Sequence, residues 1–298
     1  MQDLIRASIL GAFVADALAL GAHWVYDTAV IKNDIENIAS YHDPIAPYHK
    51  GKTAGDFTHY GDQMLVLLQS LKDNGGFDAA RFTDAWRTFF MSYNGYFDHA
   101  TKDTLKNLER GLGPDECGSE SEDLGGASRI PALLSAYHGD RDRLVTAARG
   151  QTAVTHKDPR VLDSAAFFAR ITAHTLNGDS PSAAIQLALD ADLKNVSIAD
   201  LVEAGLETRG MDTRKTIGDF GQMCGVGAAL PATVHLIVSY ENDLKTALVE
   251  NVMAGGDSAA RGMLVGMVLG AYRGMEAIPP EWIGGLKAGK QIFSLLDG

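Results

Sequence analysis

The stretch Ala254–Tyr272 reads AGGDSAARGMLVGMVLGAY. Apolar residues fill most of it, and Gly262, Gly266 and Gly270 recur four residues apart. Residues at that spacing share one face of an α-helix, so three missing side chains line up on one side. Each glycine costs about 0.5–1 kcal/mol relative to alanine inside a helix. The pattern therefore predicts a helix that packs closely against another backbone.

The same helical spacing extends to the rest of the chain. Two segments, residues 64–71 and 244–252, place their apolar residues on one helix face. Ser180-Pro181 and Asp140 stand where a helix commonly starts. Alternating β-branched runs are rare, and no Asn-Gly or Asp-Gly hairpin has strand patterns on both sides. We expect an all-α protein in which residues 1–298 form one compact multi-helix domain, because no long linker divides them.

Composition and charge exclude several classes of protein. The chain has 298 residues, 46% of them hydrophobic and 21% charged, as in ordinary soluble globular proteins. Its net charge is −12 and it has no Lys/Arg-rich run, so we expect no nucleic-acid partner. Cys117 and Cys224 lie far apart without a CxxC or His-rich pattern, which argues against a disulfide framework and against a zinc site.

The two most apolar segments do not indicate export or membrane insertion. Asp3 and Asp16 interrupt the apolar residues of the first twenty positions, and no basic segment precedes a clean apolar run. The longest stretch without charged residues, 220–240, contains Pro231, His235 and three glycines, which is more typical of a buried helix. We therefore expect a cytoplasmic protein with no membrane partner.

A glycine-rich turn, GGASRIP, begins at Gly125 and leads into an apolar helix. The backbone amides of Gly125 and Gly126, together with Ser128 and Arg129, are groups that can bind a phosphate. A plain loop would have the same pattern. The turn closes an acidic, glycine-rich segment, residues 111–126. This segment and residues 41–60, which contain two prolines and several His and Gly residues, are the least helical parts of the chain, and both are candidate functional loops.

Asp257 and His156 each have a structural and a functional interpretation. Asp257 follows Gly255-Gly256 at the expected start of the glycine-patterned helix, where it can cap the helix or face a ligand. His156, in the segment THKDP, is either a hydrogen-bonded structural residue or part of a binding site.

Acid and base groups also gather before an amphipathic helix. Residues 55–63 read GDFTHYGDQ and bring His59, Tyr60 and Asp62 together, although Asp62 would also serve as an N-cap. Asp16 lies among the apolar residues of the first helix, where a carboxyl group needs a partner. A salt bridge and a functional site explain Asp16 equally well.

The order of these segments resembles the ADP-ribosylglycohydrolase family. The matching segments are Gly11–Gly21 (GAFVADALALG), Thr58–Met64 (THYGDQM), Gly125–Pro131 (GGASRIP), Thr155–Pro159 (THKDP) and Gly255–Arg261 (GGDSAAR). The sequences DALALGAHWVYD and YGDQ are most similar to the branch that contains the J-type crystallins. That branch includes proteins with no established catalysis.

The resemblance implies an all-α fold whose central cleft binds ADP-ribose and hydrolyses the glycosidic bond of its distal ribose, usually with two Mg²⁺ or Mn²⁺ ions. The family holds these ions with a Thr-Asp-Asp motif and a closing Asp-x-Asp-Thr. In this chain, residues 59–62 (HYGD) stand where the Thr-Asp-Asp motif is expected. Ala259 and Ala260 stand where the last Asp and the Thr of the closing motif are expected. Asp257 is kept, so we expect Mg²⁺ at most as a single ion at Asp257 and Asp62, with Arg261 replacing part of the lost charge.

If the chain is an enzyme, the resemblance favours Asp62 and Asp257 as the base that positions water or as stabilisers of the sugar cation. Tyr60, His59 and Asp16 would donate or orient protons. The substrate-binding residues would be those of the glycine-rich turn and the THKDP segment: Gly125, Gly126, Ser128, Arg129 and His156.

Trp24 and Tyr26 can stack on a base or ribose, but core packing is the simpler interpretation of both.

Two functions from different classes follow. The first is a hydrolase that cleaves a ribosyl bond of a small molecule or an ADP-ribosylated protein with a degenerate metal site, or another N-glycosidic substrate without metal. The second is a catalytically retired protein that binds ADP-ribose or a nucleotide, or serves a crystallin-like structural role.

Overall fold

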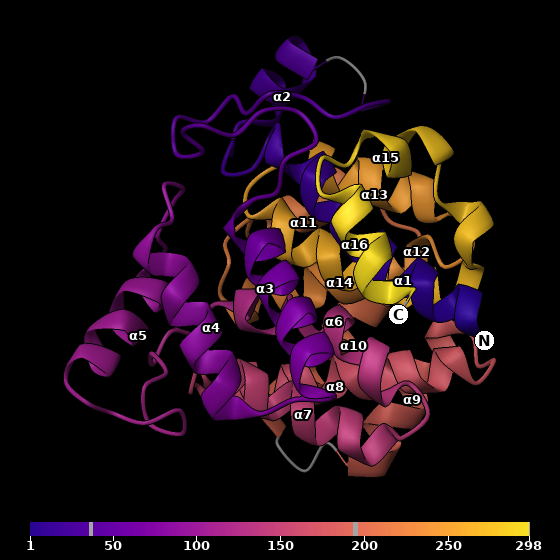
Figure 1. The fold of residues 1–298 in the computed structure, drawn as a ribbon. Helices are drawn as coiled ribbons and strands as arrows, with labels where there is room; N and C mark the ends of the chain where they lie inside the picture. Colours follow the sequence, from indigo (N-terminus) through magenta and orange to yellow (C-terminus); the bar gives the residue numbers. More distant parts are fainter. Residues whose placement is uncertain (36–37, 193–195, 298) are drawn as a thin grey trace.

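The computed structural model describes residues 1–35, 38–192 and 196–297, and these form helices joined by loops (Figure 1). None of the described residues belongs to a strand longer than an isolated bridge, so the prediction of an all-α domain is confirmed. The elements are α1 (Gln2–Leu20), α2 (Thr28–Ile35), α3 (His59–Asn74), α4 (Ala79–Met91), α5 (His99–Glu109), η1 (Leu124–Ala127), α6 (Ile130–Tyr137), α7 (Arg141–Ala153), α8 (Pro159–Leu176), α9 (Pro181–Asp192), α10 (Val196–Glu207), α11 (Thr213–Phe220), α12 (Val226–Ser239), α13 (Leu244–Met253), α14 (Ser258–Arg273), η2 (Met275–Ala277), α15 (Pro280–Gly285) and α16 (Gly289–Leu296).

Side chains at the starts of the helices show why they begin where they do. Asp140 accepts a hydrogen bond from the backbone N–H of Arg143 at 3.0 Å, as expected for the first residue before α7. The expected cap of α3 was wrong: Thr58, not Asp62, precedes this helix, and its hydroxyl accepts from the N–H of Tyr60 at 3.2 Å. Asp62 lies within the first turn of α3, where its carboxylate contacts other side chains.

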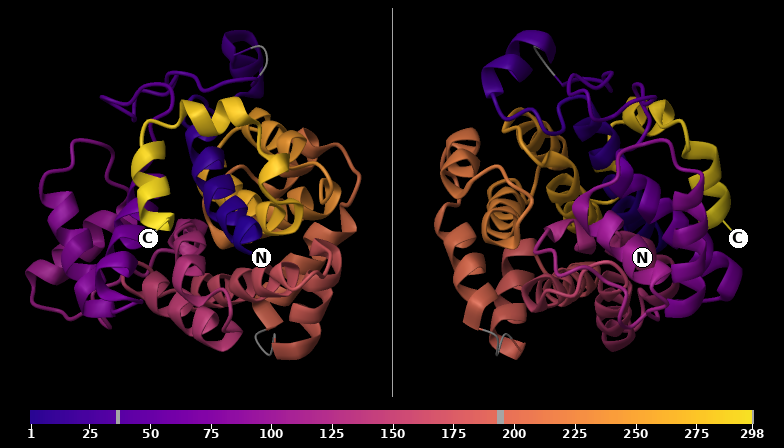
Figure 2. Two further views of the ribbon diagram at one scale, coloured as in Figure 1. Left: turned by 45° about the vertical axis from the view of Figure 1, so that its right-hand side comes forward. Right: turned by 90° about the vertical axis from the view of Figure 1, so that its left-hand side faces the viewer.

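Helices α1 and α14 pack against each other in the centre of the molecule (Figures 1 and 2). Every residue of α1 from Ala7 to Leu20 and of α14 from Ser258 to Ala271 is buried. A Cβ atom on Gly266 would overlap the carbonyl oxygen of Gly11, and one on Gly270 would overlap the carbonyl oxygen of Ala7. The close backbone contact predicted from the glycine spacing is therefore present, and its partner is the first helix.

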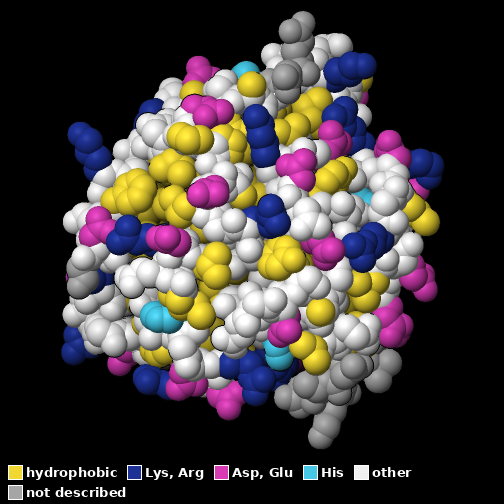
Figure 3. All heavy atoms as spheres, turned by 90° about the vertical axis from the view of Figure 1, so that its right-hand side faces the viewer, with side chains coloured by type: hydrophobic (Ala, Val, Ile, Leu, Met, Phe, Trp, Pro, Cys, Tyr) yellow, Lys and Arg dark blue, Asp and Glu magenta, His cyan; other side chains and the backbone are white. Residues whose placement is uncertain are grey.

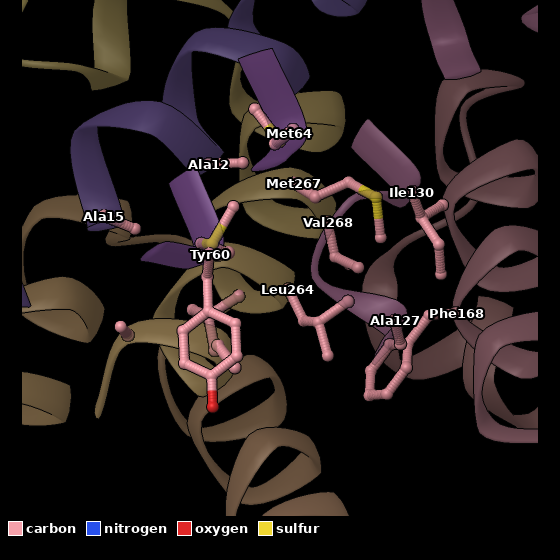
Figure 4. Close-up of a cluster of buried hydrophobic side chains, with 14 of the residues drawn as sticks. Ala12, Ala15, Tyr60, Met64, Ala127, Ile130, Phe168, Leu264, Met267 and Val268 are labelled. Carbon is pink, nitrogen blue, oxygen red and sulfur yellow. The ribbon is translucent and has the colours of Figure 1, made fainter. Parts of the chain in front are cut away.

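Other helices surround this pair and complete one core. Figure 4 shows side chains from α1, α3, α8, α14 and the η1–α6 turn meeting at one place. Leu264 and Val268 of α14 lie there beside Tyr60 of α3 and Phe168 of α8. The hydroxyl end of Tyr60 points out of this cluster, so one side chain belongs both to the core and to the polar region described below.

The C-terminal helices hold the loop that precedes α3. The hydroxyl of Tyr41 donates to the carbonyl of Trp282 at 2.6 Å, and the indole of Trp282 donates to the carbonyl of Ala39 at 2.8 Å. Further along, the backbone N–H of Lys287 donates to the carbonyl of Gly55 at 3.0 Å. These contacts fix both ends of the loop and thereby the start of α3.

The lengths of the helices and the state of the two cysteines complete the description of the fold. No helix in the described part of the chain is long and apolar enough to cross a membrane. Cys117 and Cys224 are both free thiols.

Candidate active site

A pocket of about 350 Å³ lies where seven parts of the chain meet. The turn after α1, the loop before α3, the starts of α3 and α5, and the residues just before η1, α12 and α14 all contribute to it. Five of its twelve lining residues are Trp or Tyr, and carboxyl groups lie among them. The lining residues are Trp24, Tyr26, Tyr48, Tyr60, Tyr96, Asp98, His99, Ala100, Ser121, Asp123, Cys224 and Asp257.

Two buried carboxyl groups in this pocket share one hydroxyl. The Tyr60 hydroxyl lies 3.1 Å from Oδ2 of Asp123 and 3.2 Å from Oδ2 of Asp257. Burial raises the pKa of Tyr60 well above its usual value, and the charges of Asp123 and Asp257 raise it further, so the hydroxyl stays protonated and can donate to one oxygen at a time. Burial raises the pKa of Asp123, and the charge of Asp257 raises it further. Burial raises the pKa of Asp257 as well, so the pair favours one neutral and one charged carboxyl group.

Asp257 occupies the position before α14 but does not cap it. Its Oδ2 accepts instead from the indole N–H of Trp24 at 3.1 Å, while its Oδ1 is buried without a hydrogen-bond partner. The nearest ring nitrogen, Nε2 of His23, is 4.0 Å from Oδ1. Burial and the nearby His49 hold the pKa of His23 well below its usual value, so His23 is neutral and forms no ion pair with Asp257.

The backbone around Asp257 explains the two glycines before it. Gly255 and Gly256 have φ values of +72° and +70°, in the left-handed region that favours glycine. Trp24 also has a positive φ, +65°, a conformation that costs a non-glycine residue about 1–2 kcal/mol. Its backbone N–H donates to the carbonyl of Gly256 at 2.9 Å. The turn before α14 thus fixes Trp24 and Asp257 against each other.

The glycine-rich turn holds Asp123 and Tyr60 in place. The backbone N–H of Gly125 donates to Oδ1 of Asp123 at 2.7 Å, so this amide, which we expected to face a phosphate, already has a partner. A Cβ on Gly125 would overlap the ring of Tyr60, and one on Gly126 would contact the ring of His156. Gly125 therefore allows the close approach of the tyrosine that joins the two carboxyl groups.

A third acid, Asp98, forms an ion pair at the pocket wall. Its Oδ2 lies 2.9 Å from Nε2 of His59, and its Oδ1 accepts from the backbone N–H of Thr101 at the start of α5. Burial alone would raise the pKa of Asp98 and lower that of His59. The hydrogen bond and charge interaction between them outweigh burial, so the pKa of Asp98 is lowered and that of His59 is raised. His59 is therefore a charged partner of Asp98 behind the pocket.

Asp16 and Asp62 do not line the pocket. Asp16 accepts hydrogen bonds from the backbone N–H of Thr58 at 2.8 Å and from its hydroxyl at 2.5 Å, and so fixes the residue that caps α3. Asp62 contacts Nζ of Lys52 at 2.5 Å and the hydroxyl of Tyr93 at 2.6 Å. Both carboxyl groups support the helix that carries Tyr60.

The remaining predicted binding residues form a buried network beside the pocket. Arg129 donates to the side chain and carbonyl of Gln151, to the side chain of Gln63 and to the hydroxyl of Thr155, at 2.7–3.1 Å. His156 lies within 2.9 Å of that same hydroxyl, and the Ser128 hydroxyl donates to a backbone carbonyl. None of Arg129, His156, Ser128, Gly125 and Gly126 is among the lining residues.

Several lining residues were absent from the sequence prediction. Asp123 is the last acid of the loop singled out at residues 111–126, and its place just before Gly125 was the available signal. Trp24 and Tyr26 were more simply explained by core packing, but both line the pocket. Tyr48 lies in the other candidate loop, residues 41–60, although the residue itself was not singled out. Nothing in the local sequence marks Tyr96, Asp98 or Cys224 as pocket residues.

The donor set does not fit a centre with two magnesium ions. Among the described residues, one group has potential ligand atoms within 4.8 Å of one another: Asp123, Cys224 and Asp257. Mg²⁺ prefers oxygen ligands, and two adjacent ions need more than two carboxylates to offset their repulsion. The expected single-ion pairing of Asp257 with Asp62 does not occur in this group, because Asp123 takes that place.

Arg261, which we expected to replace part of the lost positive charge, hydrogen-bonds to residues other than Asp257. It is buried and donates to the side chain and carbonyl of Asn251, at 2.7 and 3.0 Å, and to the carbonyl of Gly255 at 2.9 Å. Its charge nevertheless acts on Asp257, where it opposes the rise in pKa caused by burial.

The model of the ADP-ribosylglycohydrolase family matches residues 1–298. The chain belongs to the ADP-ribosylglycohydrolase family. Crystallin J1A of Tripedalia cystophora is 25% identical over 99% of this chain and 96% of its own length. The ADP-ribosylhydrolase ARH3 of Homo sapiens is 22% identical over 93% of this chain and 87% of its own length. This ADP-ribosylglycohydrolase-family chain thus resembles both a crystallin and a hydrolase along most of its length.

A solved structure confirms the fold of this family member. The chain superposes on one described as an ADP-ribosylglycohydrolase-related protein complex with a TM-score of 0.71 and 21% sequence identity. The match covers 99% of this chain and 96% of that one. The resemblance inferred from the sequence segments is therefore confirmed for the family and for its fold.

Proposed function

We propose that this protein hydrolyses a ribosyl glycosidic bond in the pocket of Asp123 and Asp257, on an ADP-ribosyl or related substrate and without a two-ion centre. The observation that carries the proposal is the Tyr60 hydroxyl placed between two buried carboxyl groups, 3.1 and 3.2 Å from them. Glycosidases commonly use one neutral and one charged carboxyl group, and the environment of this pair favours that state. Membership of the ADP-ribosylglycohydrolase family supports the substrate class.

The surroundings of each carboxyl group assign its role. Asp257 accepts from Trp24 and Tyr60 and lies at the N-terminus of the sixteen-residue helix α14, all of which stabilise a negative charge. It would stabilise the developing sugar cation and accept a proton from the attacking water. Asp123, kept neutral beside it, would protonate the leaving group as the glycosidic bond breaks. Tyr60 would keep the two groups in position.

The residues predicted outside the pocket would act by positioning. Asp16 fixes Thr58 at the start of α3, and His59 pairs with Asp98 at the wall. For Asp62 we keep the prediction of a contribution to turnover, and its hydrogen bonds indicate that the contribution passes through α3.

The test compares Asp123→Asn, Asp257→Asn and Asp62→Asn with the unchanged protein. Turnover of N- and O-linked ADP-ribosyl conjugates would be followed by product release, with and without a metal chelator. We expect each pocket variant to lose turnover by about 100-fold or more while binding persists, because general acid–base catalysis contributes about that much. We expect a smaller loss for Asp62→Asn. Turnover that survives both pocket substitutions would contradict the proposal.

A catalytically retired binding protein is the second candidate function. It is favoured by the similarity to Crystallin J1A and by the incomplete magnesium donor set. If the unchanged protein binds ADP-ribose but turns over no ribosyl conjugate, this second function replaces the first.

A further inference from the structure

The charge of the pocket is unlike that expected for a phosphate-bearing ligand. Asp98, Asp123 and Asp257 line it, and none of its described lining residues is Lys or Arg. The nearest cation over an aromatic wall is Lys102, whose Nζ lies 5.5 Å from the centroid of the Tyr96 ring but which does not line the pocket. Asp98 is paired with the charged His59 and Asp123 is kept neutral, so the negative charge that a ligand meets is mainly that of Asp257. A diphosphate placed here would meet that charge with no Lys or Arg among the lining residues, which costs binding energy.

Three aromatic rings of the pocket, those of Trp24, Tyr48 and Tyr96, pack edge to face against one another. Trp24 and Tyr48 have centroids 5.5 Å apart and planes at 84°, and Trp24 and Tyr96 are 4.5 Å apart at 67°. Tyr48 and Tyr96 complete the set at 5.9 Å and 75°. Together the three rings form an aromatic wall of the pocket. Such a wall can attract an organic cation, because the face of an aromatic ring carries partial negative charge.

One carboxylate oxygen of Asp257 has no hydrogen-bond partner among the described residues. Asp257 is 3% exposed, and its Oδ1 makes no hydrogen bond. A buried, unpaired carboxylate oxygen is costly, because it has lost water without gaining another partner. A cation held by the aromatic walls would offset that cost.

The neighbouring hollow does not supply an anion site. It shares His99 and Ser121 with the pocket, so the two spaces adjoin. Its charged lining residues balance, with three cations and three acids: Lys106, Arg110, Lys157, Asp103, Glu120 and Glu122. Lys157 is moreover paired with Glu120 at 3.2 Å. The charge of Asp257 therefore makes the aromatic pocket the more favourable of the two spaces for a positive ligand.

We propose, building on the hydrolase function above, that this pocket binds an organic cation, and that its substrate is an N-riboside whose glycosidic nitrogen carries the positive charge. A pyridinium riboside without a diphosphate is the simplest member of this class. Trp24, Tyr48 and Tyr96 hold the charged ring, and Asp257 lies beside the anomeric carbon.

The chemistry of such a substrate does not need a metal ion. The bond between the anomeric carbon and the nitrogen breaks, and its electron pair stays on the nitrogen, which becomes neutral. The positive charge moves to the sugar as an oxocarbenium ion beside the carboxylate of Asp257. Water then adds to the anomeric carbon and loses one proton to that carboxylate. The products are free ribose, a neutral aromatic base and a proton.

The binding test uses choline and its neutral isostere 3,3-dimethylbutan-1-ol, because neither contains a bond that the enzyme can cleave. Calorimetric titration of the full-length protein should give at least tenfold tighter binding for choline. Tyr48→Leu should weaken choline binding about fivefold, whereas Tyr48→Phe, which keeps the ring, should not. Tyr48 is 51% exposed, so both variants are expected to fold. Equal binding of choline and its isostere would overturn the proposal.

The turnover test separates this inference from the proposed function. The pyridinium riboside is compared with its dihydropyridine form, which has nearly the same shape but no charge, and with ADP-ribosyl conjugates. Cleavage of the charged riboside alone supports both proposals. Cleavage of ADP-ribosyl conjugates with no preference for the charged riboside overturns this inference and leaves the hydrolase function standing. Choline binding without cleavage of any riboside supports the cation pocket and refutes the hydrolase.

Discussion

Asp16 is a carboxyl group enclosed within a central helix, and its titration should be visible in stability. Burial raises its pKa to about 7 from an ordinary 3.8, although two hydrogen bonds from Thr58 oppose the rise. The folded protein therefore holds this proton more tightly than the unfolded chain. The stabilisation from Asp16 is full below about pH 4 and is lost as the pH rises to about 7.

We predict that Asp16→Asn flattens the pH dependence of unfolding between about pH 4 and 7, by up to about 1.4 kcal/mol per pH unit. Urea unfolding at a series of pH values measures the difference between variant and parent. Asp84→Asn, the same substitution at an exposed carboxyl group, serves as the matched control. Parallel curves for parent and Asp16→Asn would show that Asp16 does not titrate in this window.

The candidate site was predictable from sequence only where a residue was out of place in its local pattern. Asp257, after two glycines, and Tyr60, before an amphipathic helix, stood out in this way and do meet in the structure. Arg129 stood out for the same reason, yet its guanidinium is held by Gln63, Gln151 and Thr155. Long-range hydrogen-bond partners decide between these outcomes, and no local pattern encodes them.

The contact between α1 and α14 makes a sharp prediction about glycine. We expect Gly266→Ala to destabilise the protein by about 1–3 kcal/mol, because the new methyl group overlaps the backbone of Gly11 and neither central helix can move away. Gly218→Ala in α11 is the control, since a Cβ there meets nothing within 4 Å. It should stabilise by about 0.4–1 kcal/mol. Chemical denaturation of both variants measures the difference, and equal effects would refute the close contact.

The helices themselves were largely predictable, because apolar spacing and capping residues are local. The spacing of Gly262, Gly266 and Gly270 correctly indicated a close partner but did not identify it. Gly266 and Gly270 face α1, whereas a Cβ on Gly262 would contact the side chain of Asn251 in α13. The exposed loops around Tyr48 and Tyr96 lack such periodicity, so the positions of these rings could not be predicted.

For the molecule as a whole, the donor set predicts a fold that does not depend on magnesium. We expect millimolar Mg²⁺ or a chelator to shift the thermal midpoint by less than about 1 °C, because a bound ion stabilises only through sites that fit it. Differential scanning calorimetry and magnesium titration measure this. Two tightly bound ions, or a chelator-induced loss of several degrees, would contradict the prediction. On the face shown in Figure 3, acidic and basic side chains are interspersed, so we expect the ion to bind only weakly to that surface.

The hydrogen bond from Trp24 to Asp257 joins positions 233 residues apart in the chain. Tyr60 connects a third distant part of the chain to the same site through its hydrogen bonds to Asp123 and Asp257. A proteolytic cut that released either end of the chain would remove one wall of the pocket. A short fragment should therefore lack the ligand binding and the activity of the whole pocket. Two complementary fragments, in contrast, should regain ligand recognition when they reassociate, and the indole of Trp24 supplies a fluorescent reporter of that event.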